Sequence, residues 1–153
     1  MSDYNLDVSV GMAMDAIKIM TVDDHPLMRE GIAAVIQGQA GMEIVAEAGN
    51  GRQAIEMFAT HRPDVTLMDL QMPIMNGIDA IKALRLEFPS ARFIVLTTYQ
   101  GDVQVVRALK AGAAGYLLKD KIWKELPETI RIVHSGRRQI TPEIAEVRNR
   151  ATE

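Results

Sequence analysis

The 153-residue sequence predicts an α/β fold, a doubly wound parallel sheet of five strands with helices on both faces. Strand-like and helix-like stretches alternate from residue 16 onward, which is the pattern of successive βαβ units. The strand candidates are nearly continuous apolar runs, as expected where helices cover both faces of a parallel sheet. Four of these runs end in reactive polar side chains, and the carboxyl ends of parallel strands share one edge of a sheet.

Short runs of β-branched and aliphatic residues predict the strands. The run at 93–97 is the most continuous, and the run at 43–48 is the weakest because glutamates interrupt it. Turn residues such as Asn76-Gly77 separate the strands from the helices. In chain order, the expected strands are residues 17–22, 43–48, 65–69, 93–97 and 116–118.

Apolar residues at helical spacing predict a helix after each strand. Pro26 suits the first turn of the first helix, where its missing N–H needs no partner. Asn50 is suited to cap the second helix, and Pro89 ends the third. In chain order, the expected helices are residues 26–37, 51–60, 78–88 and 102–111, a fifth helix that ends near 135, and a short last helix over 142–149.

The fifth helix is difficult to place because Pro127 falls where the helix should already be running. Proline lacks one donor and crowds the carbonyl four residues before it, so we expect this helix to start near residues 124–126. Thr141 and Pro142 then suit the N-cap and the first position of the last helix.

Three regions are expected along the chain. Residues 1–15 show no clear period and include the possible starts Met12 and Met14, so we interpret them as an extension or tag-like leader. Residues 16–136 are expected to form the folded domain. Residues 137–153 are expected to be a linker with a short C-terminal helix.

The composition is that of one globular domain that can form its own core. Hydrophobic residues make up 48% and charged residues 24%, so wholesale disorder is not expected. A net charge of −3 argues against a nucleic-acid-binding face, and the absence of cysteine excludes disulfides and thiol catalysis. No apolar run approaches the length of a membrane span, and the N-terminal stretch is acidic rather than basic. We expect a cytoplasmic protein without membrane contact.

The strand ends carry the candidate chemistry. The residues at these ends are Asp23 and Asp24 in the first strand, Asp69 in the third, Thr97 in the fourth and Lys119 in the fifth. Converging carboxylates repel one another and raise one another's pKa unless a cation is present. Mg²⁺ prefers oxygen ligands, while an ammonium and a hydroxyl suit phosphoryl oxygens. The sequence therefore predicts a Mg²⁺ and phosphoryl site at this edge of the sheet.

Asp69 is the candidate nucleophile of this site, since carboxylates can form covalent aspartyl phosphates. The alternative for Asp23, Asp24 or Asp69 taken singly is that it only caps a loop or a helix. That alternative weakens when all the strand ends are considered together.

Four stretches join these strand ends to the loops that follow them: VDDHPLMREGI, LMDLQMPIMNGID, IVLTTY and AGAAGYLLKD. In this combination they resemble the receiver domain of bacterial two-component response regulators, above all the NarL/FixJ-type (LuxR-type) subfamily. The resemblance covers about residues 16–136. It implies a flavodoxin-like sheet with strand order 2-1-3-4-5 and a phosphoprotein of phosphorelay signal transduction. In full-length members of the subfamily the receiver controls transcription.

The resemblance assigns roles to the acidic residues. Asp69 would accept a phosphoryl group from a histidine kinase. Asp24, Asp69 and the backbone carbonyl of Gln71 would ligate Mg²⁺, and Asp23 would hold metal-bound water.

The resemblance also implies that Thr97 and Lys119 contact the phosphoryl oxygens and that Tyr116 is an aromatic switch. If Thr97 moves toward the phosphoryl group, the space it leaves can accept the Tyr116 ring, so a local charge change alters the nearby surface. The alternative for Tyr116 is a half-buried strand aromatic with its hydroxyl in water. A homodimer is expected on phosphorylation.

Other residues near these motifs have less specific expected roles. Gln71 and Tyr99 flank the expected path of attacking water, where a bulky Tyr99 would lengthen the phosphorylated state; either is alternatively a solvated loop position. His25, like the other histidines, lacks metal-like spacing and is expected at the polar surface. Trp123 is expected to be an amphipathic surface or interface residue.

The sequence also departs from the family pattern. Asp120 follows Lys119 where many receivers have proline, although this subfamily often carries the Lys-Asp pair. Members usually continue into a helix-turn-helix domain, whereas this sequence ends at Glu153, so we expect no nucleic-acid binding by it alone. Whether the shorter form is truncated or natural stays open.

Three classes of function remain. A phosphoacceptor signalling domain, which is not an enzyme beyond its own phosphorylation and dephosphorylation, is favoured. An aspartyl-phosphate phosphatase would need a second acid where Gln71 stands. A receiver-like interaction or dimerisation module that works without phosphorylation is the remaining alternative. The sequence does not identify the cognate kinase, the regulated process or the dimerisation face.

Overall fold

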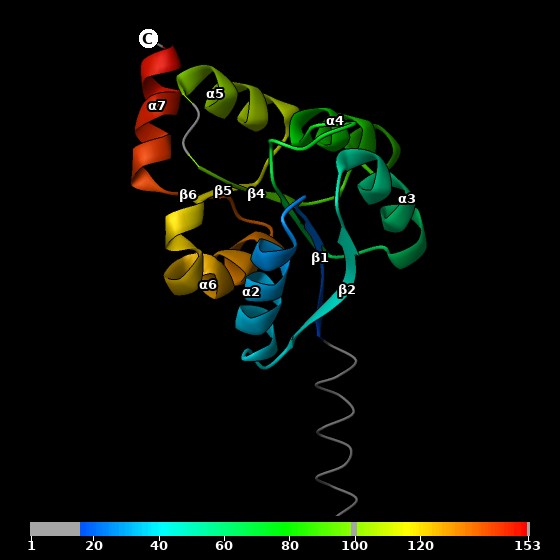
Figure 1. Cartoon of the computed structure of the whole chain (residues 1–153). Coiled ribbons are helices and arrows are strands. Elements are labelled where there is room, and N and C mark those ends of the chain that lie inside the picture. Colours follow the sequence, from blue (N-terminus) through cyan, green and yellow to red (C-terminus); the bar gives the residue numbers. More distant parts are fainter. Residues whose placement is uncertain (1–15, 99–100, 153) are drawn as a thin grey trace, which may run out of the picture.

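The computed structural model describes residues 16–98 and 101–152, which form a parallel sheet with helices on both faces (Figure 1). The strands lie in the order β2-β1-β3-β4-β5-β6. They are β1 (Ile17–Val22), β2 (Met42–Ala48), β3 (Val65–Met68), β4 (Phe93–Thr97), β5 (Gly115–Leu118) and β6 (Gln139–Ile140). The helices are α2 (Pro26–Gln37), α3 (Gly51–His61), α4 (Gly77–Glu87), α5 (Asp102–Ala111), α6 (Ile122–His134) and α7 (Pro142–Thr152), with a 3₁₀ turn, η1 (Lys119–Lys121), before α6. The predicted fold class and the order of the first five strands are confirmed.

Two apolar layers enclose the sheet. Helices α2 and α6 cover one face, and α3, α4, α5 and α7 cover the other (Figure 1). In β4, Ile94 and Leu96 belong to the first layer, whereas Phe93 and Val95 belong to the second. Each of these side chains is at most 2% exposed. The central strands β3 and β4 are buried on both faces, which explains why their sequences are almost continuously apolar.

The sheet has a sixth strand that the sequence did not predict. Strand β6 pairs with β5 through Gly115↔Gln139 and Tyr116↔Ile140. Two residues are too few to produce a recognisable alternation, so this part of the expected linker at 137–153 gave no strand signal. The sheet therefore has six strands rather than five, and α7 extends to Thr152.

Helix α6 begins earlier than predicted. It starts at Ile122, directly after η1, and Pro127 lies inside it. Because proline has no N–H, the carbonyl of Trp123 loses its helical partner, but this turn lies at the surface, where Trp123 is 56% exposed. Ile122 and Leu126 are fully buried against the sheet and hold the turn helical in spite of the proline. The predicted start at 124–126 is wrong.

Gly77 allows α4 to begin against the end of β3. A Cβ atom at this position would lie 2.2 Å from the carbonyl oxygen of Asp69, closer than any side-chain carbon approaches. The Gly77 N–H donates to the carbonyl of Leu70 at 3.0 Å. Asn76 caps the helix because its side-chain oxygen accepts from the Asp79 N–H at 2.9 Å. The loop after Asp69 is thereby fixed to α4.

We predict that Gly77→Ala lowers the free energy of unfolding by about 1–3 kcal/mol, because the added methyl group forces the β3–α4 connection apart. Gly38→Ala is the control, since Gly38 has a φ of −76° and a Cβ there would make only an ordinary contact, 3.5 Å from the Val35 carbonyl oxygen. Urea unfolding followed by circular dichroism measures both variants. Equal stability of the two variants would contradict the prediction.

Candidate functional site

The carboxyl edge of the sheet carries acidic side chains from two adjacent strands. Asp23 follows β1 and Asp69 follows β3, and these strands pair directly. The Asp23 N–H donates to the carbonyl of Ala48 at 3.0 Å, and the Asp69 N–H donates to that of Val22 at 2.9 Å. The two carboxylates, 3% and 4% exposed, are therefore positioned by the hydrogen-bond ladder itself.

Lys119 joins these two carboxylates. It follows β5 at the start of η1, and its side chain is 15% exposed. Its Nζ atom lies 3.1 Å from Asp23 Oδ2 and 3.5 Å from Asp69 Oδ1. The structure thus brings together the lysine and two of the carboxylates that the sequence placed at strand ends.

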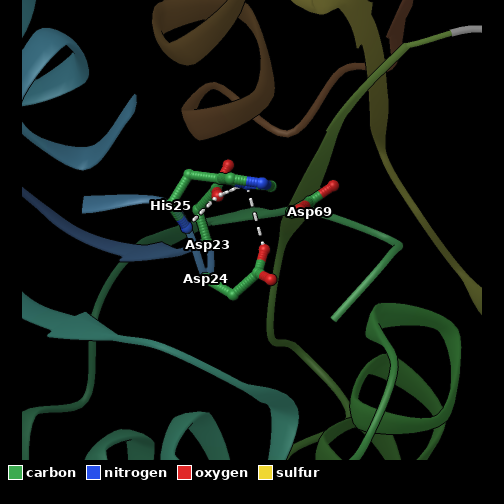
Figure 2. Close-up of side chains that lie close together, drawn as sticks. All are labelled: Asp23, Asp24, His25 and Asp69. Carbon is green, nitrogen blue, oxygen red and sulfur yellow. Dashed lines mark hydrogen bonds and ion pairs between the residues drawn. The ribbon is translucent and has the colours of Figure 1, made fainter. Parts of the chain in front are cut away.

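Asp24 and His25 complete the acidic cluster, which Figure 2 shows with Asp23 and Asp69. The His25 Nδ1 atom lies 3.0 Å from Asp23 Oδ1 and 3.1 Å from Asp24 Oδ1. One ligand atom from each of the four residues lies within 4.8 Å of the others. His25 is exposed, as expected, but its ring faces the acidic pair, a contact that the sequence analysis missed. The available signal was its position directly after Asp23-Asp24.

The two residues expected to form the switch lie on neighbouring strands. Thr97 ends β4 and is buried, and its hydroxyl donates to the carbonyl of Thr98 at 2.9 Å. Tyr116 lies in β5, is fully buried and belongs to the apolar layer on the α3–α5 side of the sheet. The alternative of a half-buried tyrosine with its hydroxyl in water is therefore wrong.

The loop after β3 closes one side of the site. The Gln71 N–H donates to Asp69 Oδ1 at 3.4 Å, and the Gln71 side chain is exposed. Gln71 and Asp24 also line a cavity of about 390 Å³, whose far wall includes Gln104 and Arg107 of α5. Tyr99, the other residue expected to affect the lifetime of the phosphorylated state, lies outside the described residues.

The negative charge of the carboxylates in the cluster exceeds the positive charge that Lys119 supplies. Burial raises the pKa of the Asp69 carboxyl from 3.8 to about 6; Lys119 lowers that pKa, whereas the negative charge of Asp23 raises it further. One ammonium group therefore does not compensate for the desolvation and the nearby carboxylates. An additional cation would favour the ionised form of Asp69.

The donor set suits a hard divalent cation. Carboxylate oxygens are the ligands that Mg²⁺ prefers, and bonds of about 2.1 Å in an octahedron separate neighbouring ligands by about 3 Å. Apart from its contact with the imidazole, Asp24 Oδ1 is a buried oxygen without a hydrogen-bond partner in the described part of the chain. The residues present therefore fit Mg²⁺.

Residues 19–131 match the family model described as the response regulator receiver domain. The transcriptional regulatory protein LnrK of Bacillus subtilis is 37% identical over 128 residues, which are 84% of this chain and 58% of that protein. The response regulator GacA of Pseudomonas aeruginosa is 36% identical over 130 residues, which are 85% of this chain and 61% of that protein. The chain spans about three fifths of the length of these relatives.

Solved structures agree with this match. A LuxR-family two-component response regulator from Aurantimonas is 35% identical, with a TM-score of 0.84 over 90% of this chain and 99% of that one. The receiver domain of a putative NarL from Mycobacterium tuberculosis is 33% identical, with a TM-score of 0.77 over 80% of this chain and 99% of that one. The chain belongs to the response regulator receiver family, and the similarity to LuxR- and NarL-type regulators is confirmed.

Within residues 16–98 and 101–152, no helix is both long enough and apolar enough to cross a bilayer.

We predict that the metal-free protein loses roughly 2 kcal/mol of stability between pH 4 and pH 7.5 through Asp69 alone, because its pKa is raised from 3.8 to about 6 in the fold. A raised folded-state pKa gives stability at low pH that disappears as the carboxyl ionises. Asp69→Asn removes this term, so the variant should gain stability over wild type as the pH rises. Urea unfolding in EDTA at both pH values measures the difference.

The control for this comparison is Asp120→Asn, at an exposed position of η1. Its stability difference from wild type should stay nearly constant with pH. If Asp69→Asn behaves in the same way, ionisation of Asp69 carries no penalty in the fold.

Proposed function

We propose that this chain is a phosphoacceptor signalling domain in which Asp69 receives a phosphoryl group from a histidine kinase in a Mg²⁺-dependent reaction. The observation that carries this proposal is the contact of Lys119 Nζ with both Asp23 and Asp69, at the edge where β1, β3 and β5 end. An ammonium beside a buried carboxylate suits a group that must accept a phosphoryl charge. Membership of the receiver family supports the same role.

The reaction requires Asp69 to be ionised. One of its oxygens attacks the phosphorus of a phosphohistidine, a P–O bond forms as the P–N bond breaks, and the histidine nitrogen leaves with the electron pair and takes up a proton. A pKa of about 6 leaves the carboxyl mainly ionised at neutral pH. Lys119 would then neutralise charge on the transferred phosphoryl oxygens.

The metal ligands are proposed to be Asp24, Asp69 and the backbone carbonyl of Gln71, with Asp23 holding a metal-bound water. When bound, Mg²⁺ would offset the negative charge that accumulates on the phosphoryl oxygens. His25 lies at the edge of this set and would have to leave its present contacts with Asp23 and Asp24 or adjust them.

The response to phosphorylation is proposed to pass through Thr97 and Tyr116. The Thr97 hydroxyl, now bonded to the carbonyl of Thr98, would turn to a phosphoryl oxygen. Space freed near β4 would admit a rearrangement of the buried Tyr116 ring and change the surface around α5 and β5. This surface would control homodimerisation or an output domain, as in transcription regulators of the family, and the protein would act in the cytoplasm.

A role as an enzyme acting on other molecules is not proposed. The position two residues after Asp69 is occupied by Gln71, whose exposed amide cannot supply the second acid that an aspartyl-phosphate phosphatase needs. The domain is therefore proposed to catalyse only its own phosphorylation and dephosphorylation.

We predict that incubation with Mg²⁺ and acetyl phosphate adds a single base-labile phosphoryl group to the wild type and none to Asp69→Asn. Intact mass spectrometry detects the adduct. Wild type treated in EDTA should show little or no adduct, because the carboxylate cluster then lacks its cation. If no donor gives an adduct with or without Mg²⁺, the domain is a phosphorylation-independent interaction module.

We predict that Lys119→Met slows phosphorylation by acetyl phosphate about a hundredfold, because a charged group that stabilises the transferred phosphoryl oxygens is lost. Lys121→Met is the matched control, since Lys121 lies two residues further along η1 and is not part of the cluster. The time course of adduct formation by mass spectrometry compares the two. Similar rates for both variants would remove Lys119 from the mechanism.

A further inference from the structure

The C-terminal segment folds back over the domain instead of leading away from it. Strand β6 adds to the edge of the sheet at β5, where the Gln139 N–H donates to the carbonyl of Ala114 at 2.9 Å. Helix α7 then lies alongside α5 (Figure 1). The Arg138 guanidinium also donates to the carbonyl of Ala113 at 3.2 Å. The segment is therefore attached to β5 and α5, and not only to its own neighbours in the chain.

Apolar packing holds α7 in this place. Ile144 and Val147 are 0% and 3% exposed and belong to the same buried layer as Val105 and Ala108 of α5. An ion pair between Arg150 and Asp102, 3.6 Å apart, lies at the surface, where such pairs contribute little. The docking of α7 thus depends mainly on the fit of its two buried side chains against α5.

Tyr116 connects this packing to the phosphorylation site. In the sheet it is paired with Val95 of β4 on one side and with Ile140 of β6 on the other. Its fully buried ring belongs to the same apolar layer as Ile144 and Val147. Close-packed interiors respond to the displacement of a large ring by repacking and not by gradual deformation. A rearrangement of Tyr116 therefore alters the surface on which β6 and α7 are docked.

We propose that β6 and α7 form an intramolecular latch that is docked in the unphosphorylated domain and loosened when Asp69 is phosphorylated. The inference rests on the proposed function, because it takes Tyr116 as the element that responds to Asp69. Coupling between two sites is reciprocal. Docking of the latch consequently opposes the phosphorylated state, and weakening the latch favours it.

Hydrogen exchange tests the first claim, that phosphorylation of Asp69 loosens the latch. Wild type and Asp69→Asn are incubated with Mg²⁺, with or without acetyl phosphate, and exchange of residues 139–152 is followed by mass spectrometry. Phosphorylation should speed exchange in this segment by about tenfold or more in wild type and leave Asp69→Asn unchanged. An adduct without faster exchange overturns the latch and leaves the proposed function intact. A missing adduct overturns the proposed function itself.

Binding of a phosphoryl mimic tests the second claim, that weakening the latch favours the phosphorylated state. Calorimetry compares the affinity of wild type, Ile144→Ala and Glu146→Gln for beryllofluoride in the presence of Mg²⁺. Ile144→Ala, which weakens the docking of α7, should bind about fivefold or more tightly than wild type. Glu146 is 73% exposed on the same helix, so its variant should bind like wild type. The proposal is overturned if all three proteins bind beryllofluoride with equal affinity although hydrogen exchange in α7 is already fast in Ile144→Ala. That result would show that docking of the latch is not coupled to the phosphorylation site.

Discussion

The contact of one ammonium group with two buried carboxylates constrains much of this domain. Lys119 follows β5, whereas Asp23 and Asp69 follow β1 and β3, so the lysine stem has to extend past the end of β4 to reach them. Adjacent strands lie about 4.8 Å apart, and β3 and β1 are two and three strand positions from β5, so the lysine and aspartate side chains together span the gap. Strand order and the length of the lysine side chain together determine which carboxylates the ammonium group contacts.

The same contact leaves the site short of positive charge. Burial is the main reason that the pKa of Asp69 is raised to about 6; the charges of Asp23 and Asp24 raise it further, whereas Lys119 lowers it. Replacing one of these carboxylates would relieve the repulsion. The burial of the two apolar layers of the sheet stabilises the fold and offsets the cost of the cluster. A bound cation would offset the imbalance by adding positive charge, and the need for it would increase once a phosphoryl group added further negative charge.

Most of the fold and of this cluster followed from the sequence, because both depend on where apolar runs end. Asp23, Asp69 and Lys119 were predicted to converge since parallel strands end at one edge. The position of His25 directly after Asp23-Asp24 places it near the acidic pair, but its contact with both carboxylates depends on its side-chain rotamer, which the sequence does not determine. β6 is too short to show a period, and its pairing with β5 depends on contacts made elsewhere by α7. The start of α6 was predicted wrongly because the burial of side chains on either side of Pro127 outweighs the cost of a proline inside the helix.

Tyr116 lies on β5, between β4, which ends at Thr97, and β6, which leads into α7. Its side chain is fully buried on the face of the sheet that α7 covers. A surface tyrosine could turn without consequence, but a ring with no exposed area can move only if its neighbours repack. The apolar layer that contains the ring also contains Ile144 and Val147, which the sequence placed in the short C-terminal helix of the expected linker. The C-terminal segment thus shares an apolar layer with the residue proposed to respond to phosphorylation.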